Sequence, residues 1–209
     1  MSESELLLKL KNEIENHFKS DLLPFWTEFA IDDINGGFVG QITYDNTKVY
    51  NAPKGGILNA RFIWSFSAGF KKFGTKNLEN AAKIAYNYFV SNFVDKVNGG
   101  FYWIIDENGN VIDDRKHIYA QAFGIYGLIE YYSAFKDEST LKLAFQVFDL
   151  IERNSKDFEN GGYFESYNGR WELNEDARLS DKDENEPKSM NTHLHILEAY
   201  TNLYRHTKN

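Results

Sequence analysis

The sequence predicts an all-α protein built from tandem helix pairs, with short β-hairpins at one end of the pairs. A motif of the form D-x-x-N-G-G-[FY] begins at Asp32, at Asp95 and at Asp157, so successive copies are 63 and 62 residues apart. Such regular spacing is typical of repeat architectures, in which each copy is one supersecondary unit. Between the copies, amphipathic segments alternate with segments that are apolar on nearly every side, which predicts alternating outer and buried inner helices.

The amphipathic segments are the predicted outer helices. One helix face is marked by apolar residues at the spacing i, i+3, i+4, i+7, namely Leu78, Ala81, Ala82 and Ala85. Thr75 is a suitable N-cap for this helix, and Gly74 is a suitable end for the helix before it. Residues 140–151 repeat the pattern, residues 3–18 are expected to do so, and residues 22–31 are expected to form a helical turn that completes the first unit.

The predicted hairpins and inner helices follow each motif in turn. Extended aromatic segments come directly after the Gly pairs, and Asn-Gly at 108–109 and at 168–169 is typical of a hairpin turn. Residues 57–70, 117–132 and 190–204 are then apolar almost all round, as expected of buried helices. Stacked pairs of this kind can form an open solenoid or a closed α/α barrel, and the periodicity does not decide between them.

The chain is predicted to be a single partial domain over residues 1–209, with repeat units of about 1–73, 74–135 and 136–209. Terminal repeats of such arrays need a polar cap, and nothing after the last predicted inner helix provides one. Three helix pairs therefore leave an apolar flank. We expect this flank to be covered by further sequence or by a partner.

The composition excludes several classes of protein. The formal net charge is −8 and there is no Lys/Arg-rich run, which disfavours a nucleic-acid binder. No apolar stretch approaches the ~20 residues of a membrane-spanning helix, so no membrane partner is expected. The absence of cysteines excludes disulfides, thiol nucleophiles and Cys-based zinc sites, and together with a charged N-terminal segment it favours a cytoplasmic protein.

Polar side chains occur near the start of each predicted inner helix, although an unpaired polar group in a buried helix costs roughly 1–3 kcal/mol. They are Asn59 and Arg61, then Tyr119 and Gln121, then Asn191, His193 and His195. Each hairpin leads into the N-terminal end of an inner helix, so these side chains should gather at one mouth of the assembly. The nearby aromatic residues are Trp64, Trp103, Phe123 and Tyr126. Converging polar groups among aromatics are typical of a sugar pocket.

Each of these residues also has a structural interpretation. Arg61 could satisfy backbone carbonyls, and Tyr119 could be a core tyrosine with a bonded hydroxyl. Asn191 and His195 are i, i+4 and share a helix face, whereas His193 should point elsewhere. The remaining histidines are expected at the surface, namely His17, His117 and His206.

An acidic segment over residues 176–190 partly matches a metal-binding loop. Three residues match the first, third and fifth positions of a calcium-binding EF-hand loop, namely Asp181, Asp183 and Asn185. Glu186 and Thr192 occupy the positions where that loop needs Gly and Glu, so no calcium site is expected. The segment is either a solvated loop or one that hangs over the mouth and places one carboxylate on a substrate hydroxyl. No metal, nucleotide or serine-hydrolase motif occurs, so no metal or cofactor is expected.

Residues 178–205, RLSDKDENEPKSMNTHLHILEAYTNLYR, closely resemble the segment ending in M-N-T-H-L-H-x-L-E-A-Y-T in cellobiose 2-epimerases, which belong to the N-acylglucosamine 2-epimerase superfamily. NARFIWSFSAGF (59–70) and NGGFYWIIDENGNVIDDRKHIYAQAFGIYGL (98–128) resemble the same family in the same order. The resemblance covers essentially the whole chain. It implies a closed α/α barrel of six helix pairs, of which this chain holds about half. It also implies a cofactor-independent reaction at the reducing-end glucose of β-1,4 disaccharides such as cellobiose.

The family reaction implies a role for each matching residue. After the sugar ring opens, one histidine removes the C2 proton, an enediol(ate) forms, and a second histidine returns a proton on the other face. Arg61 matches the arginine near O1 and O2, which stabilises the developing oxyanion. Tyr119, Asp183 and Asn191 match substrate-contacting positions. His195 matches the first of three active-site histidines, which assists at the C1 oxygen or in ring opening.

The proton-transferring histidines of the family lie in a second half that nothing in this sequence matches. Full activity is therefore not expected of this chain alone, and a C-terminal half-barrel partner or self-association would have to complete it. An aldose–ketose isomerase would use the same enediol. A catalytically inactive, carbohydrate-binding or dimerising half-barrel would expose the same apolar flank. A glycan hydrolase or lyase would need paired carboxylates, for which Asp183 is the one candidate.

Overall fold

The computed structural model describes residues 2–208, and helices account for most of them. The long helices are α1 (Glu3–His17), α2 (Gly56–Phe73), α3 (Lys76–Asn92), α4 (Ile118–Phe135), α5 (Glu138–Asn154) and α6 (Met190–Thr207). Two π-helical turns, η1 (Phe18–Leu22) and η2 (Phe25–Phe29), follow α1. The predicted all-α fold with alternating helix pairs is confirmed. No helix within residues 2–208 is long and apolar enough to cross a membrane.

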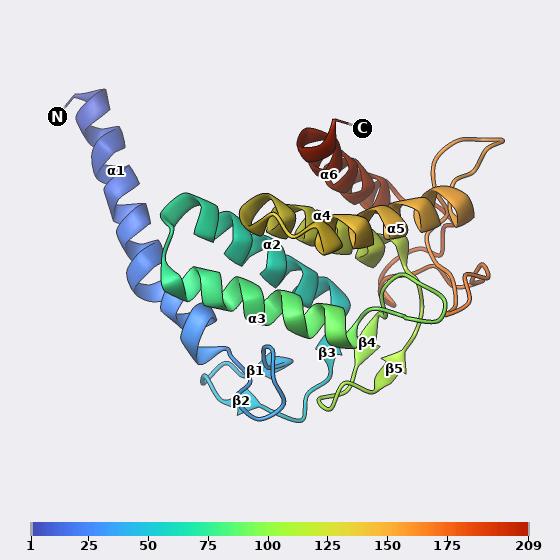
Figure 1. Ribbon diagram of the computed structural model, residues 1–209, viewed down its shortest axis with the longest axis horizontal. Coiled ribbons are helices and arrows are strands. Elements are labelled where there is room, and N and C mark those ends of the chain that lie inside the picture. The colour runs from blue at the N-terminus through green and yellow to red at the C-terminus, as the bar shows by residue number, and fades with distance from the viewer. Residues whose placement is uncertain (1, 209) are drawn as a thin grey trace.

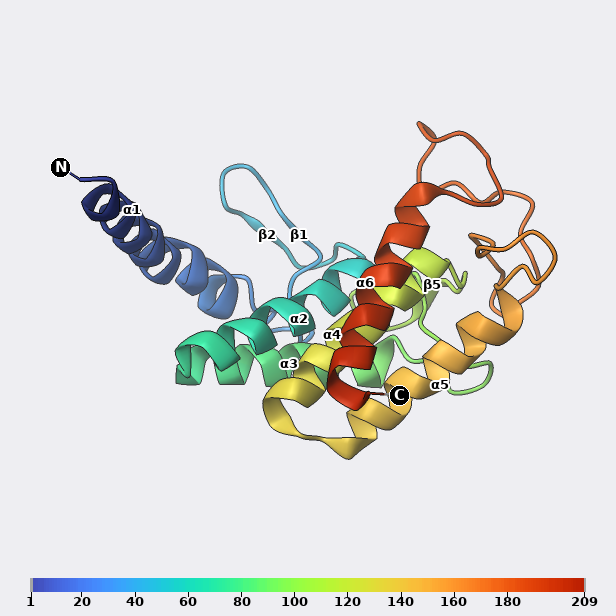
Figure 2. The same cartoon turned by 90° about the horizontal axis from the view of Figure 1, so that it is seen from above.

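The inner helices α2, α4 and α6 lie side by side, with α4 in the middle (Figure 1 and Figure 2). The outer helices α3 and α5 pack behind them, α3 mainly against α2 and α5 against α4. The predicted face of α3 is buried, with Leu78 and Ala85 both fully inaccessible. Because α4 has neighbours on three sides, most of its residues are buried, whereas α2 and α6 each keep one open edge.

The first outer helix differs from its expected packing. α1 is helical and begins with a capping box between Ser2 and Glu5, but none of its residues is buried. It projects away from the other helices in both views (Figure 1 and Figure 2), and its apolar residues Leu7 and Ile14 are exposed. A helix of this length is marginal in water without tertiary packing. The apolar face of α1 therefore belongs to a surface that this chain does not cover.

The predicted hairpins form short strands at the N-terminal ends of the inner helices. β1 (Gln41–Ile42) pairs with β2 (Lys48–Val49). β4 (Ile104–Ile105) pairs with β5 (Val111–Asp113), and β3 (Lys54–Gly55) adds to the free edge of β4. The third hairpin is reduced to one bridge between Tyr167 and Leu173. All strand pairs are antiparallel, and β3 thereby joins the first and second repeats.

Each N-G-G motif is tied to the start of the following inner helix by an ion pair. In the second repeat, the Asp95 carboxylate accepts hydrogen bonds from the amides of Val97 and Asn98, and its other oxygen lies 2.8 Å from Lys116 Nζ. Lys116 precedes the first residue of α4 by two positions. The equivalent pairs are Asp32 with Lys54 before α2 and Asp157 with Lys188 before α6. The three pairs hold the inner helix starts at one end of the structure.

Candidate active site

Three of the predicted site residues form one cluster across the inner helices. The ring of Phe123 on α4 lies 4.4 Å from the guanidinium carbon of Arg61 on α2 and 4.5 Å from the imidazole of His195 on α6. The Tyr119 ring, one turn before Phe123, is 4.6 Å from the same imidazole. Phe123 is buried and therefore serves as the common platform. We call Arg61, Tyr119, Phe123 and His195 the inner-helix cluster.

His195 also contacts a carboxylate on its own helix. Its Nδ1 lies 2.7 Å from Glu198 Oε2, one turn further along α6. A carboxylate can only accept a hydrogen bond, so this contact places the proton of a neutral imidazole on Nδ1. The Nε2 atom is then left with its lone pair, which suits it to accept a proton from a sugar hydroxyl.

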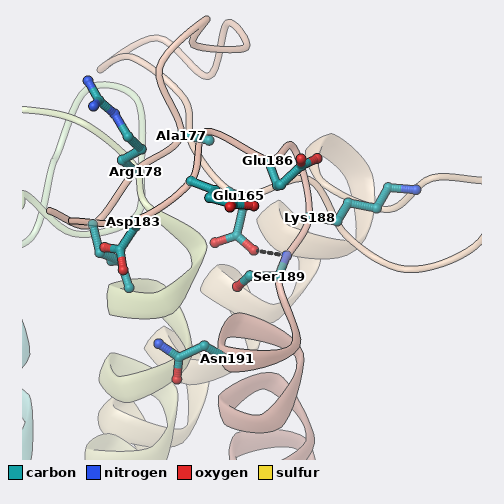
Figure 3. Close-up of a pocket in the computed structure, with 10 residues that line it drawn as sticks. Glu165, Ala177, Arg178, Asp183, Glu186, Lys188, Ser189 and Asn191 are labelled. Carbon is teal, nitrogen blue, oxygen red and sulfur yellow. Dashed lines mark hydrogen bonds between the residues drawn. The ribbon is translucent and has the colours of Figure 1, made fainter. Parts of the chain in front are cut away.

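The other two predicted residues line a pocket at the start of α6. This cavity has a volume of about 300 Å³ and is bordered by Glu165, by loop residues that include Arg178 and Asp183, and by Asn191 (Figure 3). The Asp183 carboxylate accepts hydrogen bonds from the amide and hydroxyl of Ser180. Asn191 is exposed and lies one helical turn before His195 of the inner-helix cluster, on the same face of α6.

The other polar residues predicted near the starts of the inner helices form hydrogen bonds with the backbone. Gln121 accepts a hydrogen bond from the Phe101 amide and donates one to the Phe101 carbonyl. His193 occupies the matching position of α6, where its Nε2 accepts from the Tyr163 amide. Asn59 occupies the matching position of α2 and donates to the Gly55 carbonyl. His193 therefore points away from His195, as its spacing predicted.

The prediction that His117 lies at the surface is wrong. Its side chain is fully buried, where its Nε2 lies 3.0 Å from the Ala177 carbonyl and its Nδ1 accepts from the Tyr119 amide at the N-terminus of α4. Burial lowers the pKa of His117, which favours the neutral ring. Trp103, expected at the mouth, packs against this imidazole instead, with 5.3 Å between ring centroids.

Glu165 was not singled out by the sequence. It is 3% exposed, and its carboxylate accepts hydrogen bonds from the Ser189 amide and the Thr192 hydroxyl at the start of α6. Its Oε2 atom lies 3.8 Å from His117 Nε2. A buried carboxylate needs such partners. The signal in the sequence is weak, because Glu165 and His117 are far apart along the chain and belong to no motif.

The two outer edges of the inner-helix row are open. On one side, a groove of about 300 Å³ between the π-helical turns and α2 is lined by apolar residues that include Trp26 and Leu58, and Arg61 borders it. On the other side, α6 exposes Leu194 and Leu197. The predicted apolar flank is thus present at both ends of the row of helices.

Taken together, the fold and the cluster define one half of an α/α barrel, with polar side chains at the N-terminal ends of its inner helices. The profile of the N-acylglucosamine 2-epimerase (GlcNAc 2-epimerase) family matches residues 36–209. The chain therefore belongs to the N-acylglucosamine 2-epimerase family.

The similar proteins are about twice as long as this chain. Cellobiose 2-epimerase from Bacteroides fragilis is 43% identical over 196 residues, which are 94% of this chain and 50% of that protein. The structure of cellobiose 2-epimerase from Spirochaeta thermophila superposes with a TM-score of 0.92 at 36% identity, over 98% of this chain and 51% of that one. The enzyme from Bacillus thermoamylovorans gives 0.92 at 40% identity, over 96% and 52%. The chain thus spans about half the length of these relatives.

Proposed function

We propose that this chain supplies one half of the active site of a sugar 2-epimerase. The enzyme interconverts glucose and mannose configurations at C2 of the reducing-end sugar of a β-1,4 disaccharide of the cellobiose type. The observation that carries the proposal is the inner-helix cluster, in which a cation, a phenol and an imidazole from three helices meet in a half-barrel similar to cellobiose 2-epimerases. The reaction needs no cofactor, because an imidazole can move a proton near neutral pH.

Arg61 stabilises the charge that develops in this reaction. Removing the proton from C2 of the open-chain sugar yields an enediolate, whose negative charge lies mainly on the C1 oxygen, next to the hydroxyl at C2. The guanidinium group carries a delocalised positive charge and offers several N–H donors in one plane. Arg61 is exposed on this wall, and its contact with the buried Phe123 ring favours one orientation of the guanidinium before the charge forms.

His195 moves protons on hydroxyl groups at this wall of the site. With Nδ1–H directed at Glu198, Nε2 accepts the proton of the C1 hydroxyl and passes it to the ring oxygen as the C1–O5 bond breaks, and ring closure reverses this transfer. Tyr119 binds a sugar hydroxyl beside it. Asp183 and Asn191, which border the neighbouring pocket, bind hydroxyls of the sugar further out.

The second half of the barrel completes the reaction. Inversion at C2 needs bases on opposite faces of the planar enediol, whereas α2, α4 and α6 form a single wall. We propose that a C-terminal half-barrel, either downstream sequence or a separate chain, covers the groove beside α2 and the open edge of α6 and brings the C2 bases. Self-association is the alternative. We further propose a cytoplasmic location, which suits a sequence without cysteines.

The test combines this chain with the C-terminal half of the Bacteroides fragilis enzyme and supplies cellobiose in heavy water. The proposal expects a product epimeric at C2 that carries deuterium at that carbon, and little product from either half alone. A ketose product would indicate the aldose–ketose isomerase. Saturable sugar binding without exchange at C2 would indicate an inactive binding module, and either result would contradict the epimerase proposal.

A further inference from the structure

Two buried ionisable residues outside the proposed chemistry connect the mouth of the site to the helices beneath it. His117 precedes α4, and Glu165 follows the third N-G-G motif. Their partners lie at the two ends of the loop over residues 177–189, which carries Asp183. The loop therefore has a buried attachment at its start and another at its end.

The hydrogen bonds of His117 define its protonation state. The Ala177 carbonyl can only accept, so Nε2 must carry the proton that points at it. The Tyr119 amide can only donate, so Nδ1 must be bare. His117 is therefore a neutral imidazole of the Nε2–H form. In this form one ring links the first residue of the loop to the backbone of Tyr119, which belongs to the inner-helix cluster.

Glu165 attaches the other end of the loop. One carboxylate oxygen accepts from the Ser189 amide, and the other accepts from the Thr192 hydroxyl within the first turn of α6. The Glu165 amide also donates to the Pro187 carbonyl, 3.0 Å away. The N-terminus of a helix favours a carboxylate, because its free N–H groups carry partial positive charge. The position of Asn191 on α6 is fixed by the same contacts.

Within the middle of the loop, by contrast, hydrogen bonds join loop residues to one another or to the segment just before the loop, where Asn185 Nδ2 donates to the Glu175 carbonyl. The Ala177 amide donates to Asn185 Oδ1, and Asp183 accepts from Ser180. Such bonds shape the loop but do not place it over the pocket. We propose that His117 and Glu165 are positioning residues, which hold the loop so that Asp183 and Asn191 border one pocket beside the inner-helix cluster. The role of the loop in sugar binding rests on the proposed function, whereas its attachment by His117 and Glu165 does not.

The test uses substitutions that separate the attachment from helix capping. In H117N, asparagine still caps α4 by accepting from the Tyr119 amide, but its shorter side chain cannot reach Ala177. E165Q keeps the shape of the side chain and turns an NH₂ group toward one of its two donors. D181N removes a charge from the exposed part of the same loop and serves as the matched control.

Amide hydrogen exchange of the 209-residue chain is the main measurement. H117N and E165Q should each speed exchange across residues 177–189 by roughly tenfold, the effect of losing one buried hydrogen bond, while the middle of α4 exchanges as in the wild type. D181N should leave both regions unchanged. Nitrogen NMR of the wild type should show His117 as the Nε2–H form. The opposite ring form, unchanged loop exchange in both variants, or equal acceleration throughout α4 would each overturn the proposal.

A cellobiose titration followed by NMR separates the attachment from the proposed function. If the wild type binds cellobiose, H117N should bind it several-fold more weakly and D181N equally well. Equal binding by H117N would contradict a positioning role. If the wild type does not bind cellobiose, the proposed function loses support, and the exchange measurements still decide whether His117 and Glu165 hold the loop.

Discussion

Lys116 Nζ lies 2.8 Å from the carboxylate of Asp95, and neither side chain is more than 2% exposed. Burial opposes ionisation of Asp95, but the Lys116 ammonium and the amides of Asn98 and Val97 outweigh it and lower the pKa of Asp95 to about 2. Asp95 is therefore ionised at neutral pH. Burial lowers the pKa of Lys116, and the hydrogen bond and charge of Asp95 oppose that shift. The aspartate of the N-G-G motif thus acts as the acidic partner of a lysine that lies two residues before an inner helix.

Removing one partner of this pair should destabilise the fold strongly. K116M leaves the Asp95 charge buried and uncompensated, which should lower the free energy of unfolding by about 3–5 kcal/mol in urea titrations. The double variant D95L/K116M should lose less than the sum of the two single variants. K9A breaks an exposed pair with Glu13 on α1 and should cost under about 1 kcal/mol. Equal losses of unfolding free energy in K116M and K9A would show that the buried pair stabilises the fold no more than the exposed pair does.

Stability should fall in mild acid because of His117. Its pKa is lowered by burial, and Arg115 lowers it further, while the Ala177 carbonyl and Glu165 oppose the change. The unfolded chain therefore binds this proton more readily, so the stabilisation is complete above the ordinary histidine pKa of about 6.5 and is lost as pH falls below it. Urea midpoints at pH 7 and pH 5 measure the loss.

The matched variant for the pH experiment is H117N, which cannot titrate in this range. It should show a smaller difference between pH 7 and pH 5 than the wild type. Burial also lowers the pKa of His206, which accounts for part of the remaining difference. An H117N chain with the full acid sensitivity of the wild type would contradict the prediction.

Arg61 should affect turnover more than sugar binding. In an enzyme completed with a C-terminal half, R61A should lower kcat by roughly 10²–10³-fold, because charge develops next to this residue only in the transition state. R61K should recover part of the loss, since it keeps the charge without the planar donors. R170A, which changes an exposed arginine of the third hairpin, is the control. A rise in KM at constant kcat would instead assign Arg61 to uniform substrate binding.

The open edge of α6 should be an association surface. Leu194 and Leu197 are exposed in this chain, so L194S and L197S should leave its thermal unfolding nearly unchanged. Each should weaken binding to the C-terminal half by roughly tenfold or more, the effect of losing a buried leucine at an interface. V97S alters a still more exposed apolar residue on the second N-G-G motif and should bind normally. Unaltered binding by both leucine variants would place the interface elsewhere.

Much of the fold follows from local patterns that the sequence displays directly. The repeat of about 62 residues, the apolar face from Leu78 to Ala85 and the Gly at the end of α2 are set by helical spacing and backbone freedom, and Gly74 indeed has the left-handed φ of 66°. The i, i+4 spacing of Asn191 and His195 likewise predicts their shared face and the different orientation of His193.

Tertiary contacts alone decided which polar residues belong to the inner-helix cluster and which are buried and bond to the backbone. Spacing gives relative directions on a helix, but the absolute direction depends on where neighbouring helices pack, so Gln121 and Arg61 could not be told apart in advance. His117 and Glu165 meet only after the chain has folded, because their contact spans two repeats. Tertiary structure also decides that the apolar face of α1 is exposed, since a helix buries its apolar side only where another element covers it.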